Sequence, residues 1–213
     1  MKITGAIFDF DGTLFSSMHI WRGVRFTFLE YLGITLTDED KKAFEGLTLI
    51  ESLKYSQEKF GITENGDDLF TLFFDYIRSR YLADACPKND IIEFLEKLKT
   101  KGVKIGIATA TAEYALKAVL EKYGMLDYFS TIRSTYAVGA AKTQPKVYDK
   151  VLEELGTDKE TTWVFEDALY AAKTAKANGY NLVGIYDVTE ENTAELEEIA
   201  DIYIHNYSEL EIE

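Results

Sequence analysis

The stretch that decides the fold is Ala6-Ile7-Phe8-Asp9-Phe10-Asp11-Gly12-Thr13-Leu14. It begins as a short apolar run, typical of a buried strand, and ends in two carboxylates two positions apart. Residues two apart in a strand point to the same face, so Asp9 and Asp11 are expected to leave the strand together. Gly12 lets the backbone turn sharply after them. Two like charges this close repel, which predicts a hard cation or a shared proton between them.

The composition is that of a soluble globular protein. Of 213 residues, 46% are hydrophobic and 28% are charged, enough for one domain or for a core with a smaller inserted domain. The formal net charge of −14 repels phosphate backbones, so we expect no nucleic-acid partner. The single cysteine, Cys86, permits no internal disulfide and is expected to be a small buried apolar side chain.

The N-terminal residues show no basic segment followed by a long apolar run, and no apolar stretch approaches membrane-spanning length. We therefore expect a cytoplasmic protein with no membrane partner. Nothing in the sequence demands more than a monomer.

After residue 86, strand and helix patterns alternate. Strands are expected at 103–108, 131–133, 162–165, 182–186 and 202–204, and helices at 91–98, 112–124, 146–155, 168–178 and 193–200. This alternation predicts an α/β fold, a Rossmann-like parallel sheet with helices on both faces. Ligands of such sheets bind beyond the carboxyl ends of the strands.

Residues 16–85 carry helical patterns and no convincing strand. One apolar face repeats at helical spacing and is typical of the core of a small helical domain; its members are Phe70, Phe73, Phe74, Ile77 and Tyr81. We therefore expect an α/β core of residues 1–15 and 86–213, and a small all-helical cap domain of residues 16–85.

Polar side chains stand at four places that a parallel sheet would bring together. They are the pair Asp9 and Asp11, then Thr109, Lys142, and the pair Glu166 and Asp167. Three of the four follow a predicted strand directly, whereas the lysine stands in a connection. Carboxylates can hold Mg²⁺, a hydroxyl and an ammonium can hold phosphate oxygens, and an aspartate can attack phosphorus.

Each place also has a purely structural explanation. Asp11 and Gly12 could form a turn, and Thr109 could cap the next helix. Lysines are mostly solvated, so Lys142 matters only through its position. Glu166 and Asp167 could be acids that favour a helix N-terminus. The two histidines, at positions 19 and 205, have no metal-ligand or triad spacing and are expected to be structural or surface residues.

The order of these motifs resembles that of the haloacid dehalogenase-like superfamily. Asp9-Phe10-Asp11-Gly12-Thr13-Leu14 is similar to its first motif, and Thr109, Lys142 and Glu166-Asp167 stand in its second, third and fourth positions. The helical insert resembles the cap that phosphoglycolate phosphatase-like and beta-phosphoglucomutase-like members carry after motif one. The chain departs from the pattern at Ala168 and Ala171, where a serine and a glycine are common, and at Thr143-Gln144, where a proline often follows the lysine.

The resemblance implies a phosphohydrolase that acts on a small phosphorylated metabolite through an aspartyl-phosphate. Asp9 would be the nucleophile. Asp11 would protonate the leaving oxygen and then activate water. Thr109 and the amide of Ala110 would hold the transferring phosphoryl group, while Lys142 would offset the charge on Asp9 and the phosphate.

The resemblance also implies a Mg²⁺ cofactor. Asp9, the backbone carbonyl of Asp11, and Asp167 would bind the ion, with Glu166 as a direct or water-mediated helper. A carboxylate bound to metal keeps a low pKa, whereas the free side chain of Asp11 can carry a proton, so two acids in different environments do different work.

Substrate choice is expected to depend on the helical insert. Trp21 and Arg25 in its first helical stretch are candidate substrate-binding residues, although a solvated helix face is the alternative for any arginine there. A sugar-phosphate phosphomutase remains open, but the cap histidine and arginine expected in such a mutase align with Trp21 and Leu49. A dehalogenase is disfavoured because Asp11 is present. A catalytically silent binding protein on this scaffold is disfavoured by the intact set of acids.

Overall fold

The computed structural model describes residues 2–212. Its centre is a six-stranded sheet in which every neighbouring pair of strands runs parallel. In spatial order the strands are β5 (Thr131–Ser134), β4 (Lys104–Thr109), β1 (Gly5–Phe8), β6 (Thr162–Glu166), β7 (Asn181–Ile185) and β8 (Ile202–Ile204). The predicted α/β fold is confirmed, and the strand that precedes the first acidic motif lies inside the sheet, paired on both sides.

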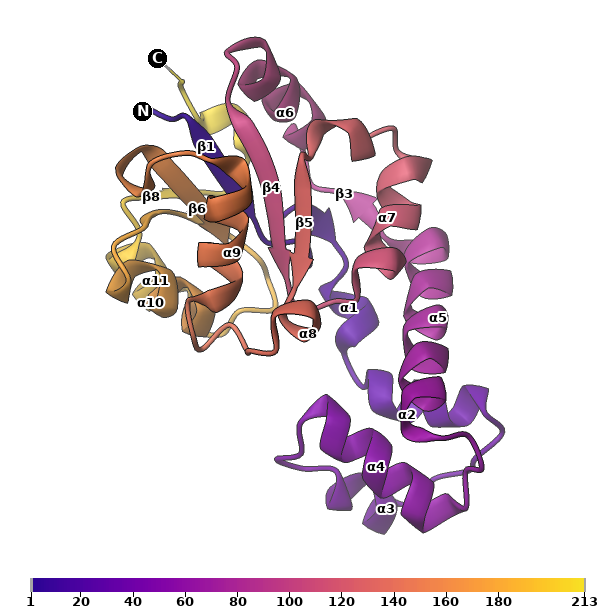
Figure 1. Ribbon diagram of the computed structural model, residues 1–213. Helices are drawn as coiled ribbons and strands as arrows, with labels where there is room; N and C mark the ends of the chain where they lie inside the picture. The colour runs from indigo at the N-terminus through magenta and orange to yellow at the C-terminus, as the bar shows by residue number, and fades with distance from the viewer. Residues whose placement is uncertain (1, 213) are drawn as a thin grey trace.

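Helices cover both faces of this sheet (Figure 1). Ala6 and Phe8 of β1 pack in one apolar cluster with residues of α6 (Ile91–Thr100) and α7 (Glu113–Lys122). Ile7 packs in a second cluster with residues of α9 (Lys146–Leu155), α10 (Leu169–Ala177) and α11 (Thr193–Ile199). Alternate side chains of one strand thus enter two different cores, as the period of two requires.

The strands and helices expected after residue 86 are all present, with ends shifted by at most two residues. One short helix, α8 (Thr135–Val138), was not predicted, because four residues are too few for a helical period to show. Three single-turn 3₁₀ helices complete this part of the chain: η1 (Leu126–Tyr128), η2 (Lys159–Thr161) and η3 (Tyr207–Glu209).

The helical segment, residues 16–85, folds beyond the edge of the sheet (Figure 1). Its helices are α1 (Met18–Trp21), α2 (Val24–Tyr31), α3 (Asp38–Ala43), α4 (Leu49–Phe60) and α5 (Gly66–Asp84). Thr37 and Thr48 begin α3 and α4 with reciprocal capping boxes. Phe73, Phe74 and Ile77 of α5 are completely buried, which confirms that this apolar face is core.

A short antiparallel ribbon joins the helical segment to the sheet. It pairs β2 (Phe15–Ser16) with β3 (Cys86–Pro87), and its two residues per strand are too few to be recognised from sequence. The expectation that Cys86 is buried is wrong, because this residue is exposed. The reason is the register, because Cys86 lies opposite the exposed Ser16 whereas Phe15 faces the core.

Among residues 2–212, the helices are too short or too polar to cross a lipid bilayer.

Candidate active site

The carboxyl ends of β1, β4 and β6 meet at one edge of the sheet and deliver the predicted polar residues there. Thr109 and Glu166 are the last residues of β4 and β6. Asp9 follows β1 directly, and its backbone N–H still donates to the carbonyl of Phe165 at 2.9 Å. The ladder therefore holds the backbone of Asp9 in register beside β6, with its side chain free to enter the site.

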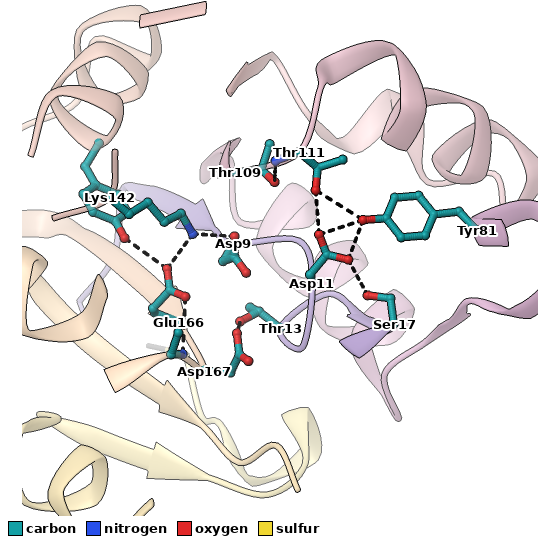
Figure 2. Close-up of polar contacts among 12 residues, drawn as sticks. Asp9, Asp11, Thr13, Ser17, Tyr81, Thr109, Thr111, Lys142, Glu166 and Asp167 are labelled. Atoms are coloured by element: carbon teal, nitrogen blue, oxygen red, sulfur yellow. Dashed lines mark hydrogen bonds and ion pairs between the residues drawn. The ribbon is translucent and has the colours of Figure 1, made fainter. Parts of the chain in front are cut away.

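Lys142 is buried at this edge between two carboxylates (Figure 2). Its Nζ donates to Oδ1 of Asp9 and, at 2.7 Å, to Oε2 of Glu166. Glu166 Oε2 also accepts a hydrogen bond from the hydroxyl of Tyr148 on α9, at 3.0 Å. Lys142 is 3% exposed, so the solvated-lysine explanation does not apply to it.

Asp9, Glu166 and Asp167 form a compact carboxylate cluster. One oxygen from each lies within 4.8 Å of the others, and all three residues are buried. The hydroxyl of Thr13 donates to Asp167 Oδ1 at 2.9 Å. Gly12 makes room for the cluster: it has φ of +84°, and a Cβ there would lie 2.0 Å from Asp167 Oδ2. Only glycine fits between the first motif and the fourth.

The charges of this cluster fit a hard divalent cation. Three carboxylates face one ammonium, so the ionised set carries an excess of negative charge within a few ångströms. An all-oxygen donor set of this kind suits Mg²⁺ or Ca²⁺ rather than a soft metal.

Without a cation, protonation offsets the repulsion. Burial, opposed by Lys142 and reinforced by Glu166, raises the pKa of Asp9 to about 8. Burial and the charge of Asp9 raise the pKa of Asp167 well above its ordinary value. Burial alone would lower the pKa of Lys142, but Asp9 and Glu166 outweigh it and raise that pKa, so the lysine stays charged.

Asp11 has different partners from Asp9 (Figure 2). The hydroxyl of Tyr81 donates to its carboxylate at 2.6 Å and 2.8 Å from the two oxygens. Ser17 Oγ donates to Oδ1 at 2.7 Å, and Thr111 Oγ1 donates to Oδ2 at 2.8 Å. We expected the two carboxylates to leave the strand together, but β1 ends at Phe8, and beyond that residue the period-two rule does not apply.

Tyr81 links this carboxylate to the helical segment. It lies on α5, is completely buried, and accepts a hydrogen bond from Trp21 Nε1 at 3.1 Å. Burial and the charge of Asp11 raise the pKa of Tyr81 well above its ordinary value, so it remains a donor. Sequence reasoning treated Tyr81 only as part of an apolar face. The available signal was chemical, because a buried tyrosine hydroxyl needs a polar partner.

The threonine of the second motif shapes the loop after β4. Thr109 is completely buried, and its Oγ1 accepts a hydrogen bond from the backbone N–H of Thr111 at 3.0 Å. The two residues that follow it, Ala110 and Thr111, line a cavity beside the acids.

This cavity has a volume of about 270 Å³. Asp9, Asp11, Lys142, Glu166 and Asp167 form its polar end. Its walls are mainly apolar and aromatic: Met18, Trp21, Leu49, Tyr136, Ala168 and Tyr170. Trp21 therefore lies where a substrate-binding residue is expected.

Arg25 is not in this cavity. It lines a neighbouring cavity that shares Trp21 and Leu49, and its guanidinium donates to the carbonyl of Phe44 at 3.4 Å. The two histidines are exposed and stand apart from the acids, as expected.

Comparisons with known proteins agree with this geometry. Residues 6–185 match the model of the haloacid dehalogenase-like hydrolase family. A phosphorylated carbohydrates phosphatase of Thermotoga maritima is 26% identical over 174 residues, which cover 81% of this chain and 80% of the relative. A phosphoglycolate phosphatase of Rhodospirillum rubrum is 25% identical over 210 residues, covering 91% and 84%.

Solved structures share the fold. The crystal structure of CbbY from Rhodobacter sphaeroides in complex with phosphate has a TM-score of 0.79 and 20% identity, covering 98% of this chain and 96% of that one. The match to the family model runs from β1 to the end of β7 and contains all the acids of the cluster. The chain belongs to the haloacid dehalogenase-like hydrolase family.

Proposed function

We propose that this protein is a Mg²⁺-dependent phosphohydrolase that acts on a small phosphorylated metabolite through an aspartyl-phosphate on Asp9. The observation that carries the proposal is the buried cluster of Asp9, Glu166 and Asp167 with Lys142 against the attacking carboxylate. Phosphoryl transfer depends mainly on positioning and charge neutralisation, which such a cluster supplies. Relatives named as phosphatases support the same reaction class.

Asp9, Asp167, Glu166 and the backbone carbonyl of Asp11 would hold the ion. When bound, Mg²⁺ would offset the negative charge of the phosphoryl oxygens and of the three carboxylates. The oxygen-only donor set and the burial of all three acids support this assignment.

In the first half of the reaction, an oxygen of Asp9 attacks phosphorus, and the bond from phosphorus to the leaving oxygen breaks. Asp11 gives its proton to that oxygen, so the alcohol departs neutral. Lys142 holds the charge of Asp9 and of the phosphoryl group. The amide of Ala110, with Thr109, would orient the transferring group.

In the second half, Asp11 takes a proton from water as the water oxygen attacks phosphorus. The bond between phosphorus and the Asp9 oxygen breaks, inorganic phosphate leaves, and both aspartates return to their starting forms. Asp11 lines the cavity and is held there by three hydroxyls, which supports its role beside the leaving group.

The proposal includes the organisation of the chain. Residues 1–15 and 86–213 would form the catalytic core, and the helical segment would be a cap that closes over the substrate to exclude bulk water. A monomer in the cytoplasm, with no nucleic-acid partner, agrees with the net charge of −14 and the single cysteine.

A panel of phosphate monoesters assayed for phosphate release tests the proposal. We expect turnover with Mg²⁺, none after chelation by EDTA, and none in Asp9→Asn under either condition. Return of the phosphoryl group to a bound sugar instead of water would identify a mutase. Undiminished turnover in Asp9→Asn would refute the assignment of Asp9 as the nucleophile. If no ester of the panel is hydrolysed, a catalytically silent binding protein would be the remaining interpretation.

A further inference from the structure

The cavity beside Asp9 has charge at one end only. Its polar end is formed by the carboxylate cluster, Asp11 and Lys142, and the helical segment contributes Trp21, Leu49 and Met18 to its lining. Tyr136 and Tyr170 of the core add aromatic surface to the lining. A phosphoryl group at the acids would therefore leave the rest of the substrate against apolar and aromatic side chains.

Lys142 is the single cationic side chain along this cavity in the part of the chain that the structure describes. Its ammonium already contacts Asp9 and Glu166. The arginines of α5 point to other partners: Arg78 pairs with Asp75 at 3.2 Å, and Arg80 pairs with Asp84 at 3.0 Å.

Arg25 lines the adjoining cavity, where its guanidinium donates to the carbonyl of Phe44. A second negative charge on the substrate would therefore find no side-chain cation in this cavity other than Lys142. The carboxylate of a glycolate ester, or the second phosphate of pyrophosphate, would lose water of hydration and lie against apolar and aromatic side chains instead. Burying an unpaired charge is among the costliest changes in a protein interior, whereas an apolar group gains free energy on leaving water.

We propose that this cavity selects a phosphate monoester whose leaving alcohol is uncharged and presents an apolar or aromatic face. This inference rests on the proposed function and names its substrate class. The volume agrees: about 270 Å³ equals that of about nine liquid waters at ~30 Å³ each. That is room for a phosphoryl group and one ring or short branched chain. Trp21, Tyr136 and Tyr170 supply aromatic side chains that such a group can contact.

Two phosphate esters of primary alcohols test the effect of charge on the leaving alcohol, because both release the same type of leaving group. Benzyl phosphate carries a neutral aromatic group, and 2-phosphoglycolate carries a carboxylate. With Mg²⁺ we expect kcat/KM for benzyl phosphate to exceed that for 2-phosphoglycolate by at least about tenfold, which corresponds to ~1.4 kcal/mol. The uncharged, polar 2-hydroxyethyl phosphate should fall between them.

A pair of substitutions on neighbouring residues tests the wall itself. Leu49 is the first residue of α4 and lines the cavity, whereas Ile50 beside it is 60% exposed. Leu49→Lys should lower kcat/KM for benzyl phosphate, raise it for 2-phosphoglycolate, and so reduce their ratio at least about tenfold. Ile50→Lys adds the same charge to the same helix end and should leave the ratio unchanged.

Two phosphonates that cannot be hydrolysed test the selectivity of the cavity independently of the proposed reaction. Calorimetry with Mg²⁺ should show benzylphosphonate binding more tightly than phosphonoacetate in the wild type, with the preference reduced in Leu49→Lys. That result without any ester hydrolysis would refute the proposed function and support the selectivity. Tighter binding of phosphonoacetate, or faster turnover of 2-phosphoglycolate, would overturn the selectivity even where hydrolysis proceeds.

Discussion

Asp9 and Asp11 stand two residues apart in the chain but belong to two differently built regions. Asp9 lies among charges supplied by the core, with Lys142 and two further carboxylates. Asp11 lies among hydroxyls, and those of Ser17 and Tyr81 come from the helical segment. Lys142 favours the ionised state of the first aspartate, whereas burial and the neighbouring Glu166 favour its protonated state until a cation binds. Neutral donors position the second without a cation of its own.

This difference suits two distinct chemical tasks. A nucleophile must stay ionised beside phosphate, which requires strong positive charge nearby. An acid that later acts as a base must gain and lose one proton, which a fixed lysine would oppose. Because Tyr81 belongs to α5, the position of the helical segment acts on Asp11 through a direct hydrogen bond. The predictions below change one region at a time.

Among the substitutions that keep the nucleophile, Asp11→Asn should have the largest effect, because it removes the proton donor and acceptor. We expect kcat on an alkyl phosphate to fall by about 10²–10⁴-fold, the usual contribution of general acid–base catalysis. Turnover of 4-nitrophenyl phosphate, whose leaving group needs no proton, should fall less, and the phosphoenzyme should persist longer in a rapid-quench experiment. Equal losses on both esters would contradict the acid role.

Lys142→Met should come next, because it leaves the charges of Asp9 and Glu166 without a cationic partner. We expect kcat to fall by about 10²–10³-fold, as for loss of one preorganised electrostatic donor, and stability to fall by about 3–5 kcal/mol, as for breaking a buried ion pair. Assay and urea denaturation would measure the two effects. Lys150→Met is the matched control, because its ion pair with Glu153 at 2.8 Å is exposed, and it should change neither quantity.

Tyr81→Phe should have a smaller effect, because Ser17 and Thr111 still hold Asp11. We expect about a tenfold loss of kcat on an alkyl phosphate, equivalent to ~1.4 kcal/mol in the barrier, with little change in KM or on 4-nitrophenyl phosphate. Tyr76→Phe removes another hydroxyl of α5, one that contacts Arg80, and should leave kcat unchanged. A rise in KM with kcat unaltered in Tyr81→Phe would show that the tyrosine binds substrate.

A change of pH tests the Asp9 region without any substitution, through the stability of the metal-free protein. Burial raises the pKa of Asp9 from 3.8 to about 8, so the folded state holds a proton that the unfolded chain has released. Stability contributed by this proton is full below the unfolded pKa and is lost as pH rises from about 4 through about 8.

Mg²⁺ binds the ionised carboxylates and should restore stability, by about 2.7 kcal/mol at a hundredfold excess over its Kd. The rise in Tm on adding Mg²⁺ should therefore be larger at pH 8 than at pH 5, as thermal denaturation followed by circular dichroism would measure. Asp9→Asn should reduce the rise. An equal rise at both pH values would contradict this account.

Much of the fold followed from local pattern. The strands after residue 86 are short, largely apolar runs that alternate with helical patterns, and α9 was expected at 146–155, where it lies. The ribbon of β2 and β3 was not predicted, because two residues per strand are too few to show a period. Cys86 was misplaced for the same reason, since burial in so short a strand depends on which face its partner turns outward.

The sequence by itself determined the order of the strands and the acids that follow them, because alternation and motif spacing act between near neighbours in the chain. Only the tertiary structure decided which side chains from distant parts of the chain contact each other. Lys142 reaches Asp9 across 133 positions, and Tyr81 reaches Asp11 across 70. Such meetings depend on how helices pack on a twisted sheet, which no local pattern encodes. The same packing turned an apolar wall rather than a basic one toward the acids.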